Sequence, residues 1–277
     1  MTNQFEWNPH ESQEFYDEYE STTLYGSGKS FSKDIGCDFR MDASSKELTL
    51  KVTEGGNVLW PSENFIKPGT AIRIFNGKFS VDGAESVIIG GPENNDPRRL
   101  DLDIQGELSI SAKASVQIRT DKENMAKMSV RGNGVLSVRC LEAYCYTRLE
   151  LSNNARVVID SLQVTCQKAD IKNLLTNFTL KDNAVLSFKN TNSSYGDAMP
   201  FDFLSRDYPE NIFTFIVPSD SEERKPTIFF DKLTGSTQFA AMLGRKIISI
   251  NNVTDFDYLK RKLSYDFADG GMYITIK

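Results

Sequence analysis

An eleven-residue pattern recurs along the middle of the chain, and it restricts the possible folds more than any other feature of the sequence. Apolar and polar residues alternate, a polar turn rich in Asn or Gly follows, a small residue comes next, and the alternation resumes. Alternation with a period of two indicates half-buried β-strands, and self-similarity at about 20 residues is typical of repeat architectures. The clearest copies start 20, 21 and 29 residues apart. They are 108–118, 128–138, 149–159 and 178–188; the segment 50–60 also fits, and 72–81 fits if one turn residue is dropped.

The copy at 149–159, LELSNNARVVI, shows how such a unit would bury its apolar residues. Leu149 and Leu151 point to one face of a strand, and Glu150 points to the other. One unit cannot bury that face alone, so we expect successive units to stack about 4.8 Å apart. The pattern therefore predicts an all-β protein built as a β-solenoid. An antiparallel β-sandwich is the alternative, because evenly spaced hairpins have the same spacing of strands and turns.

The polar turn of each copy is predicted to be a tight corner. Position 154 is Asn, and Asn or Gly tolerates the left-handed conformation that such a corner requires. Position 155 is Ala, and a small residue suits the inside of a bend. The aligned copies place Asn183, Asn133 and Gly55 with Asn154, and Ala184, Ala114, Gly134 and Gly56 with Ala155.

The chain divides into three predicted regions. Residues 1–36 form an acidic N-terminal cap or tail, residues 37–192 form the solenoid repeat core, and residues 193–277 form a C-terminal loop and capping region. Within the last region, the residue patterns predict a helix at 236–244, a strand at 245–250, a helix or distorted strand at 255–263, and a closing strand at 271–276.

The charge imbalance of the chain is concentrated at its N-terminus. Residues 1–20 contain six acidic residues and no Lys or Arg, which accounts for the whole formal net charge of −6. Binding to a phosphate backbone requires a basic stripe, and the sequence shows none. Nucleic acid and anionic membrane surfaces are therefore not expected partners.

Cysteine usage and the lack of targeting signals predict a cytoplasmic location. The sequence shows neither a secretory signal nor a transmembrane segment. Its four cysteines, Cys37, Cys140, Cys145 and Cys166, include no Cys-x-x-Cys pair, and the single histidine, His10, is far from them, so no metal site is expected. Free thiols suit a reducing compartment. Secretion by a signal-independent route, or a mature surface fragment, is the alternative.

The sequence predicts no catalytic residue and no cofactor. A nucleophile–histidine arrangement would have to use His10, and the GSGKS stretch at 26–30 lacks the strand and helix that flank a phosphate-binding loop. We therefore expect a protein that is not an enzyme. One weak candidate for a site that binds a sugar or an acid is a polar loop with Asp96, Arg98 and Arg99.

The alternating units with Asn-Ala or Asn-Gly corners resemble the right-handed parallel β-helices of bacterial autotransporter passengers and related adhesins. The resemblance covers residues 48–190, and 245–277 is similar to the closing region of such passengers. It implies a right-handed parallel β-helix with an N-terminal cap and a mixed C-terminal closing region. Polysaccharide lyases and hydrolases share this architecture, so a carbohydrate-binding or polysaccharide-degrading β-helix is the alternative function.

These observations favour a non-enzymatic protein-binding solenoid, such as a bacterial inhibitor, an immunity-type partner or an adhesin-like module. A structural or tail-fibre module is the second alternative. The predicted partner is another protein. Its contact surface is expected after the last clear unit, where aromatic residues and an arginine lie beside acidic groups, as in interface hot spots. The candidate residues are Tyr195, Phe201, Phe203, Arg206 and Tyr208.

Overall fold

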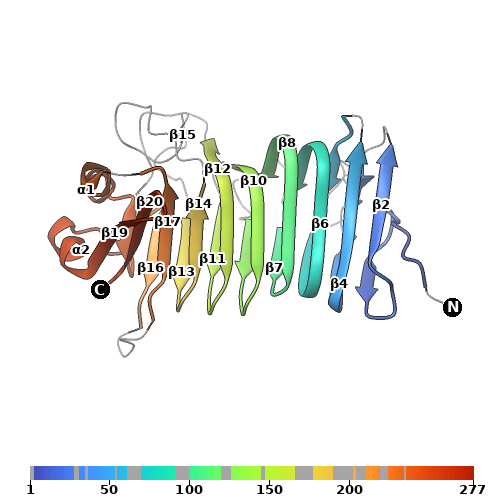
Figure 1. The fold of residues 1–277 in the computed structure, drawn as a ribbon, viewed down its shortest axis with the longest axis horizontal. Helices are drawn as coiled ribbons and strands as arrows, with labels where there is room; N and C mark the ends of the chain where they lie inside the picture. The colour runs from blue at the N-terminus through green and yellow to red at the C-terminus, as the bar shows by residue number, and fades with distance from the viewer. Residues whose placement is uncertain are drawn as a thin grey trace.

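The computed structural model of the chain is an elongated row of strands with two short helices at its C-terminal end (Figure 1). The strands join in one large mixed sheet, which confirms the predicted all-β class. The structure describes residues 3–27, 31–34, 37–53, 55–60, 70–90, 100–119, 126–144, 147–165, 177–189, 202–203, 210–218, 224–233 and 235–277.

Parallel pairing unites one set of strands into a first ladder along the molecule. Leu149 lies opposite Met128 on one side and Phe178 on the other, which confirms the alignment of the three copies that contain them. The strands in ladder order are β1 (Gln13–Tyr16), β4 (Phe39–Thr53), β6 (Thr70–Gly90), β7 (Leu100–Ile104), β9 (Ala126–Val130), β11 (Thr147–Leu151), β13 (Asn177–Lys181), β16 (Phe213–Ile216) and β18 (Ile248–Ile250).

A second ladder begins with β2 (Thr22–Ser27) and continues in parallel through later parts of β4 and β6. It ends in an antiparallel hairpin. Its further strands are β8 (Glu107–Arg119), β10 (Val135–Tyr144), β12 (Arg156–Thr165), β14 (Val185–Phe188) and β17 (Thr227–Asp231), followed by β20 (Gly271–Ile276) and β19 (Leu263–Ala268).

A third ladder uses the last parts of the long strands, which therefore belong to more than one ladder. It runs from β3 (Phe31–Ser32) and β5 (Val58–Trp60) through β6, β8, β10 and β12 to β15 (Asp202–Phe203). Among the named strands, antiparallel pairing is confined to the two contacts of β20. The sandwich alternative predicts antiparallel pairing throughout, so the observed ladders do not support it.

Two of the predicted repeat alignments are wrong in phase. Leu108 lies opposite Leu136 in the second ladder, whereas the alignment placed it with Met128 in the first. Val58 likewise belongs to the third ladder, where it pairs with Val87. The reason is that a similar pattern of alternation, small or polar residues and renewed alternation occurs at two different corners, although β8 crosses its corner as one continuous strand. Copies 50–60 and 108–118 span the corner between the second and third ladders, so Gly56 and Ala114 are not equivalents of Ala155.

Gly55 has the predicted left-handed conformation, with a φ of 77°, but in the three central copies the left-handed residue lies one position earlier than predicted. Asn153 and Asp182 have φ angles of 61° and 58°, and Gly132 has a φ of 66°. The small residue after the turn is required as expected. A Cβ atom at Gly134 would lie 2.5 Å from the carbonyl oxygen of Ile104, which no larger residue tolerates without a shift of the backbone.

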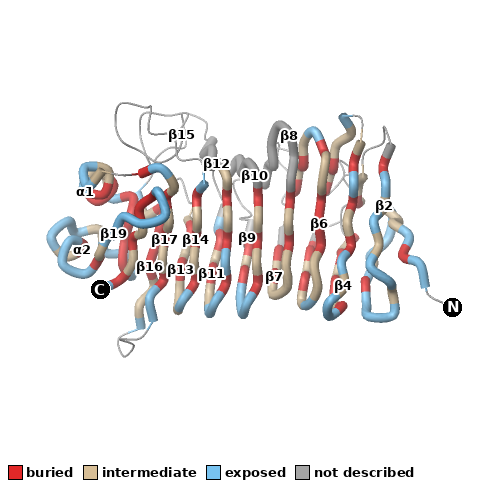
Figure 2. The backbone as a smooth tube through the Cα atoms, in the orientation of Figure 1, coloured by how far each residue is buried: buried red, intermediate tan, exposed pale blue. Residues whose placement is uncertain are grey.

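The inward side chains form a continuous apolar core along the row. Figure 2 shows buried positions alternating with less buried ones along the strands. Leu149, Leu151, Val157 and Ile159 are all 0% exposed, in agreement with the predicted inward positions. Each inward residue of one unit lies beside its counterpart in the next, so no unit buries its apolar face alone.

Both predicted region boundaries fall within continuous ladders. Strands β1 and β2, which precede residue 37, pair with β4. Strands β16 and β17, which follow residue 192, continue the first and second ladders. The paired strands therefore extend well beyond the predicted repeat core.

The N-terminal end of the row is closed by aromatic side chains. Phe5 and Phe15 are 3% and 0% exposed, and their rings meet edge to face at 5.3 Å. The ring of Trp7 lies 5.1 Å from that of Trp60. These contacts cover the apolar interior where the first strands begin, and they pack part of the acidic head against the core.

A buried lysine holds the N-terminal segment in place. The Nζ of Lys33 donates hydrogen bonds to the carbonyl oxygens of Asn8 at 2.6 Å and Glu11 at 2.8 Å, and to Oε1 of Gln13 at 2.7 Å. It also lies 4.5 Å from the centre of the Trp7 ring. Lys33 is 0% exposed, and burial lowers its pKa from 10.5 to about 8. The ammonium is therefore still charged at neutral pH, with all three protons donated.

The C-terminal elements agree with the predicted pattern. Helix α1 (Ser236–Gly244), β18 and β20 lie where they were expected. The segment predicted as a helix or a distorted strand is helix α2 (Phe256–Lys262), capped by the side chain of Asp255, which accepts a hydrogen bond from the backbone N–H of Tyr258. Strand β19 follows α2 directly.

Candidate functional site

Nearly all of the predicted site residues lie outside the described residues. Tyr195, Phe201, Arg206 and Tyr208 are among them, and Phe203 is placed only by its backbone, which pairs with Val164 in the third ladder. The weak sugar-site candidates Asp96, Arg98 and Arg99 also lie outside the described residues. The loop interface and the sugar site therefore stay predictions.

The C-terminal end carries large apolar side chains that are only partly covered. Phe256 is 40% exposed, and Tyr265 and Phe267 are each 42% exposed. We call these three residues the aromatic surface. The ring of Phe239 from α1 lies 4.7 Å from that of Tyr265, and the rings of Tyr265 and Phe267 are 5.7 Å apart. The aromatic surface therefore lies against α1 and continues along β19.

A hollow of about 490 Å³ lies between the two helices and β19. Apolar side chains form much of its wall, and two lysines stand at its rim. Lys277 donates from Nζ to the carbonyl oxygen of Lys260 at 3.1 Å, and the Nζ of Lys260 lies 6.0 Å from the centre of the Phe256 ring. The residues that line it are Ser236, Phe239, Ala240, Leu243, Phe256, Lys260, Leu263, Ser264, Tyr265 and Lys277.

The sheet ends at β19 beside this hollow. Strand β19 pairs with β20, and no other described strand pairs with it. Its side chains at 263, 265 and 267 share the face of the sheet that Met272 and Ile274 occupy in β20, both of which are 0% exposed. Tyr265 and Phe267 thus continue the apolar face of β20 onto β19, where the side chains are only partly covered.

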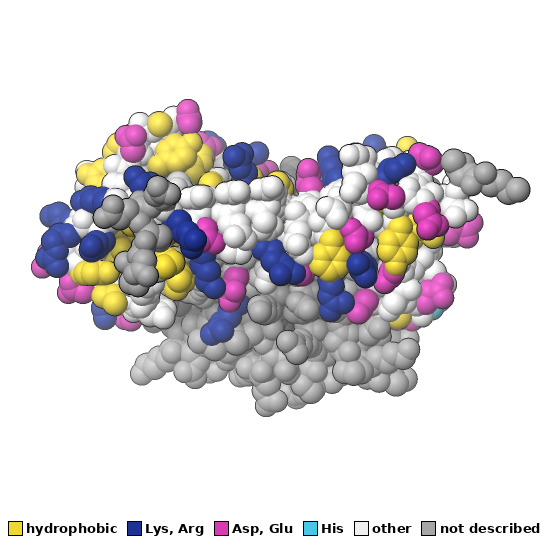
Figure 3. Space-filling view, turned by 90° about the horizontal axis from the view of Figure 1, so that it is seen from below, with side chains coloured by type: hydrophobic (Ala, Val, Ile, Leu, Met, Phe, Trp, Pro, Cys, Tyr) yellow, Lys and Arg dark blue, Asp and Glu magenta, His cyan; other side chains and the backbone are white. Residues whose placement is uncertain are grey.

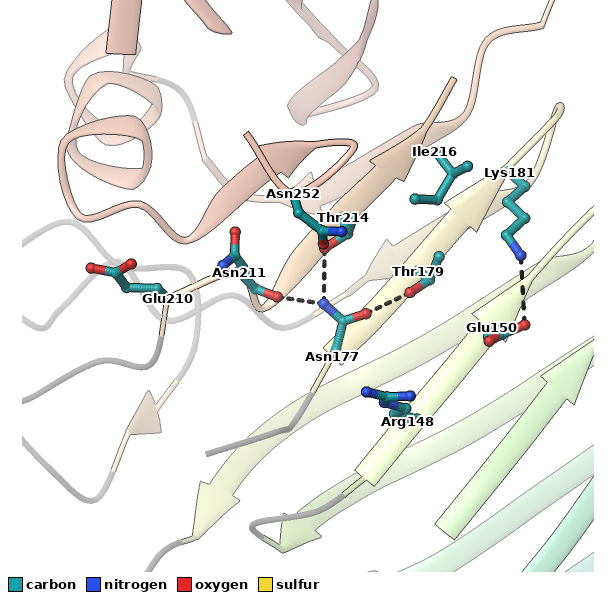
Figure 4. A pocket seen from close by; sticks show the side chains of 10 residues that line it. All are labelled: Arg148, Glu150, Asn177, Thr179, Lys181, Glu210, Asn211, Thr214, Ile216 and Asn252. Atoms are coloured by element: carbon teal, nitrogen blue, oxygen red, sulfur yellow. Dashed lines mark hydrogen bonds and ion pairs between the residues drawn. The ribbon is translucent and has the colours of Figure 1, made fainter. Parts of the chain in front are cut away.

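A second, polar hollow of about 470 Å³ lies on the outer side of the first ladder (Figure 4). The amide of Asn177 donates to the hydroxyl of Thr214 at 2.9 Å, and its oxygen accepts a hydrogen bond from Thr179. The guanidinium of Arg148 stands free of these contacts in the view of Figure 4. The lining residues are Arg148, Glu150, Asn177, Thr179, Lys181, Glu210, Asn211, Thr214, Ile216 and Asn252.

The two carboxylates of the polar hollow are each matched by a lysine. Glu150 lies 3.7 Å from the Nζ of Lys181, and Glu210 lies 3.2 Å from the Nζ of Lys246. The hollow thus offers amide, hydroxyl and guanidinium groups with little net charge among its carboxylates and lysines. Such groups form hydrogen bonds with an uncharged polar ligand or a weakly acidic one.

Charges on the outer surfaces are largely balanced between neighbouring strands. Lys78 in β6, for example, lies 3.6 Å from Glu47 in β4 and 3.6 Å from Glu107 in β8. Figure 3 shows Lys and Arg side chains interspersed with Asp and Glu, with basic and hydrophobic side chains together at the C-terminal end on the left. Exposed ion pairs of this kind contribute little stability.

The described residues include no group of three His, Cys, Asp or Glu side chains that would hold a metal ion. The single histidine, His10, places its Nδ1 2.8 Å from Oδ2 of Asp34. Cys37 is a free, buried thiol. None of the described helices is long and apolar enough to cross a membrane.

Sequence reasoning missed the aromatic surface. The segment LSYDF at 263–267 alternates apolar and polar residues, which is a strand signal. The predicted elements leave residues 264–270 unassigned, between the helix or distorted strand at 255–263 and the closing strand at 271–276. Comparison with protein-family models, with curated proteins and with solved structures found no match.

Proposed function

We propose that the chain is a right-handed β-solenoid that acts as a non-enzymatic protein-binding module, with its C-terminal end as the contact surface. The parallel, in-register ladders support the solenoid, because successive units add one strand each to the first and second ladders in the same order. A stack of this kind is a rigid platform for a binding surface.

The observation that carries the proposal is the aromatic surface at the open edge of the sheet. Three neighbouring aromatic side chains are exposed by about two fifths of their area, next to an apolar hollow with lysines at its rim. A patch of aromatic side chains bordered by charged groups is typical of protein interfaces. A partner that covers these side chains would remove their apolar surface from water, which favours binding.

Site-specific crosslinking tests this proposal. A photo-reactive amino acid replaces Phe267 in one variant and Tyr25, which is 72% exposed near the N-terminal end, in the control. We expect a partner protein to crosslink at position 267 and not at position 25. The purified partner should then bind the chain, and Phe267→Ser should weaken its Kd by about tenfold or more. Equal crosslinking at both positions, or an unchanged Kd, would contradict the proposal.

The polar hollow favours a second candidate function, saccharide binding, which rests on the convergence of Arg148, Asn177 and Thr179. A glycan array probed with the wild-type chain and with Arg148→Ala tests it. Arg156→Ala is the matched control, because Arg156 is also exposed but does not line the hollow. A glycan retained by the wild type and the control but lost by Arg148→Ala supports saccharide binding. Equal retention by all three proteins, or by none, contradicts it.

A further inference from the structure

The backbone of β19 alternates between groups bonded to β20 and groups directed away from it. The N–H of Lys277 donates to the carbonyl oxygen of Lys262 at 2.9 Å, immediately before the pair Leu263 and Ile276. Opposite residues of an antiparallel pair alternate between those that exchange hydrogen bonds and those that do not. Positions 264, 266 and 268 therefore bond to β20. The N–H and C=O groups of 263, 265 and 267 face the open edge.

Local contacts occupy two of the three donors on that edge. The N–H of Leu263 donates to the carbonyl oxygen of Leu259, and the N–H of Phe267 donates to Oδ1 of Asp266 at 2.8 Å. Tyr265 keeps both its N–H and its C=O directed outward, with no described backbone group beyond them. The open edge thus presents the N–H of Tyr265 as a free donor, with outward carbonyl groups on either side of it along the strand.

The side chains around this edge have the arrangement that an added strand would complete. Tyr265 and Phe267 lie on the same face as the buried Met272 and Ile274, but no strand lies beside them to cover them. A strand paired with β19 would direct every second side chain onto that face. Those side chains would lie over Tyr265 and Phe267 and next to the hollow between the helices.

The charges at the hollow restrict the sequence of such a strand. Lys260 and Lys277 line the hollow, and α2 ends in the basic run Lys260, Arg261 and Lys262. Basic groups beside an apolar hollow favour acidic side chains next to apolar ones. We infer that β19 binds an extended segment of a partner protein by strand addition, with apolar residues at alternate positions and Asp or Glu beside them. This inference rests on the proposed function and specifies its mode.

A proline substitution separates strand addition from other ways of covering the aromatic surface. Tyr265→Pro removes the outward N–H, and proline is tolerated in edge strands where that N–H faces solvent. Tyr265→Ala removes the ring but keeps the N–H, so it is the matched control. The probe is a random peptide library displayed on phage and selected against the wild-type chain. Thermal melting checks that each variant is folded.

Strand addition predicts selected peptides in which apolar residues alternate with Asp or Glu. Their Kd should rise by about tenfold or more from Tyr265→Ala to Tyr265→Pro, the loss expected when a bound backbone donor is removed. Lys260→Glu should weaken the same peptides. Hydrogen exchange of the wild-type chain provides a measurement without a variant, because the amide of Tyr265 should gain protection on peptide binding.

Three outcomes overturn the inference. Peptides that bind Tyr265→Pro and Tyr265→Ala equally, but lose affinity on Phe267→Ser, would leave the proposed function standing and exclude strand addition. Peptides indifferent to all three substitutions would contradict both. A dimer of the chain in light scattering that Tyr265→Pro dissociates would assign the edge to a second copy in place of a partner protein.

Discussion

At the N-terminal end of the row, Phe5 and Phe15 are 3% and 0% exposed, whereas at the C-terminal end Tyr265 and Phe267 are each 42% exposed. Both ends are rich in aromatic side chains, and both have paired strands near their termini. The difference lies in what covers the rings. At the N-terminus the chain returns across the end of the core, and Lys33 binds the returning segment through three hydrogen bonds.

At the C-terminal end the hairpin of β19 and β20 continues the sheet, and α1 covers only part of its apolar face. A single segment with a few aromatic anchors is enough to seal an end, as the N-terminus demonstrates. The open C-terminal margin is therefore consistent with a surface that another molecule covers. The two ends should accordingly respond to substitution in opposite ways.

Deleting residues 1–20 should have the largest effect. The deletion removes β1 together with Phe5, Trp7 and Phe15, and it frees the β1 side of β4 and uncovers Trp60. An uncovered edge beside an apolar core promotes aggregation. We expect the deletion protein to lose its cooperative melting transition and to elute as aggregates in size-exclusion chromatography. A soluble monomer with the melting temperature of the full chain would show that the segment is a dispensable tail.

Phe15→Ala should have the next largest effect. Phe15 is 0% exposed, and its ring contacts both Phe5 and Tyr19. Truncating a buried phenylalanine to alanine typically costs about 3–5 kcal/mol, because the cavity is only partly refilled. The free energy of unfolding from urea titration is the measurement. A loss below about 1 kcal/mol would mean that the N-terminal end is not sealed as described.

The central register was predictable from sequence because three copies carry both an Asn-rich or Gly-rich turn and a small residue after it. Leu149, Met128 and Phe178 were aligned correctly on that basis. Copy 108–118 was placed out of phase, because its pattern also fits the corner between the second and third ladders. Residue type alone does not distinguish the turn between the first and second ladders from the corner between the second and third, which β8 crosses as one continuous strand.

The candidate surface was less predictable than the fold. The alternation of 263–267 is visible in the sequence, but the exposure of Tyr265 depends on how far α1 reaches over β19. The role of Lys33 had no sequence signal, because two of its three acceptors are backbone carbonyl groups. The loop residues predicted as an interface, such as Phe201 and Tyr208, lie outside the described residues and stay predictions.

Lys33→Met should destabilise the N-terminal end by an intermediate amount. The substitution keeps the length of the side chain but leaves the carbonyl oxygens of Asn8 and Glu11 without their donor, whereas Oε1 of Gln13 still accepts from the backbone N–H of Asn8. Leaving buried polar groups unsatisfied costs about 1–3 kcal/mol. Urea titration at neutral pH measures the change. Lys225→Met is the control, because Lys225 is exposed, and it should have no comparable effect.

The dependence of stability on pH provides a second test of the buried Lys33 at the N-terminal end. The pKa of Lys33 is lowered from 10.5 to about 8 by burial, so the folded chain releases its proton before the unfolded chain does. Between these two values the unfolded state binds more protons, and stability therefore rises with pH. Below pH 8 both states are protonated and the contribution is constant. The stability of Lys33→Met relative to wild type should fall across this window. If the difference in stability between the two proteins stays constant across this window, the pKa of Lys33 is not lowered by burial.

Phe267→Ala should have the smallest effect on stability, although it changes the same residue type as Phe15→Ala. Phe267 is 42% exposed at the sheet margin, so its truncation leaves no enclosed cavity. The expected change in the free energy of unfolding is within about 0.5 kcal/mol, the usual range for surface positions. The same variant should lose most of its affinity for a partner, because an exposed aromatic side chain is buried only on binding.

A loss of several kcal/mol in the isolated chain, comparable with that of Phe15→Ala, would show that Phe267 seals the C-terminal end. In that case the contrast between the two ends, and the binding surface inferred from it, would both be wrong.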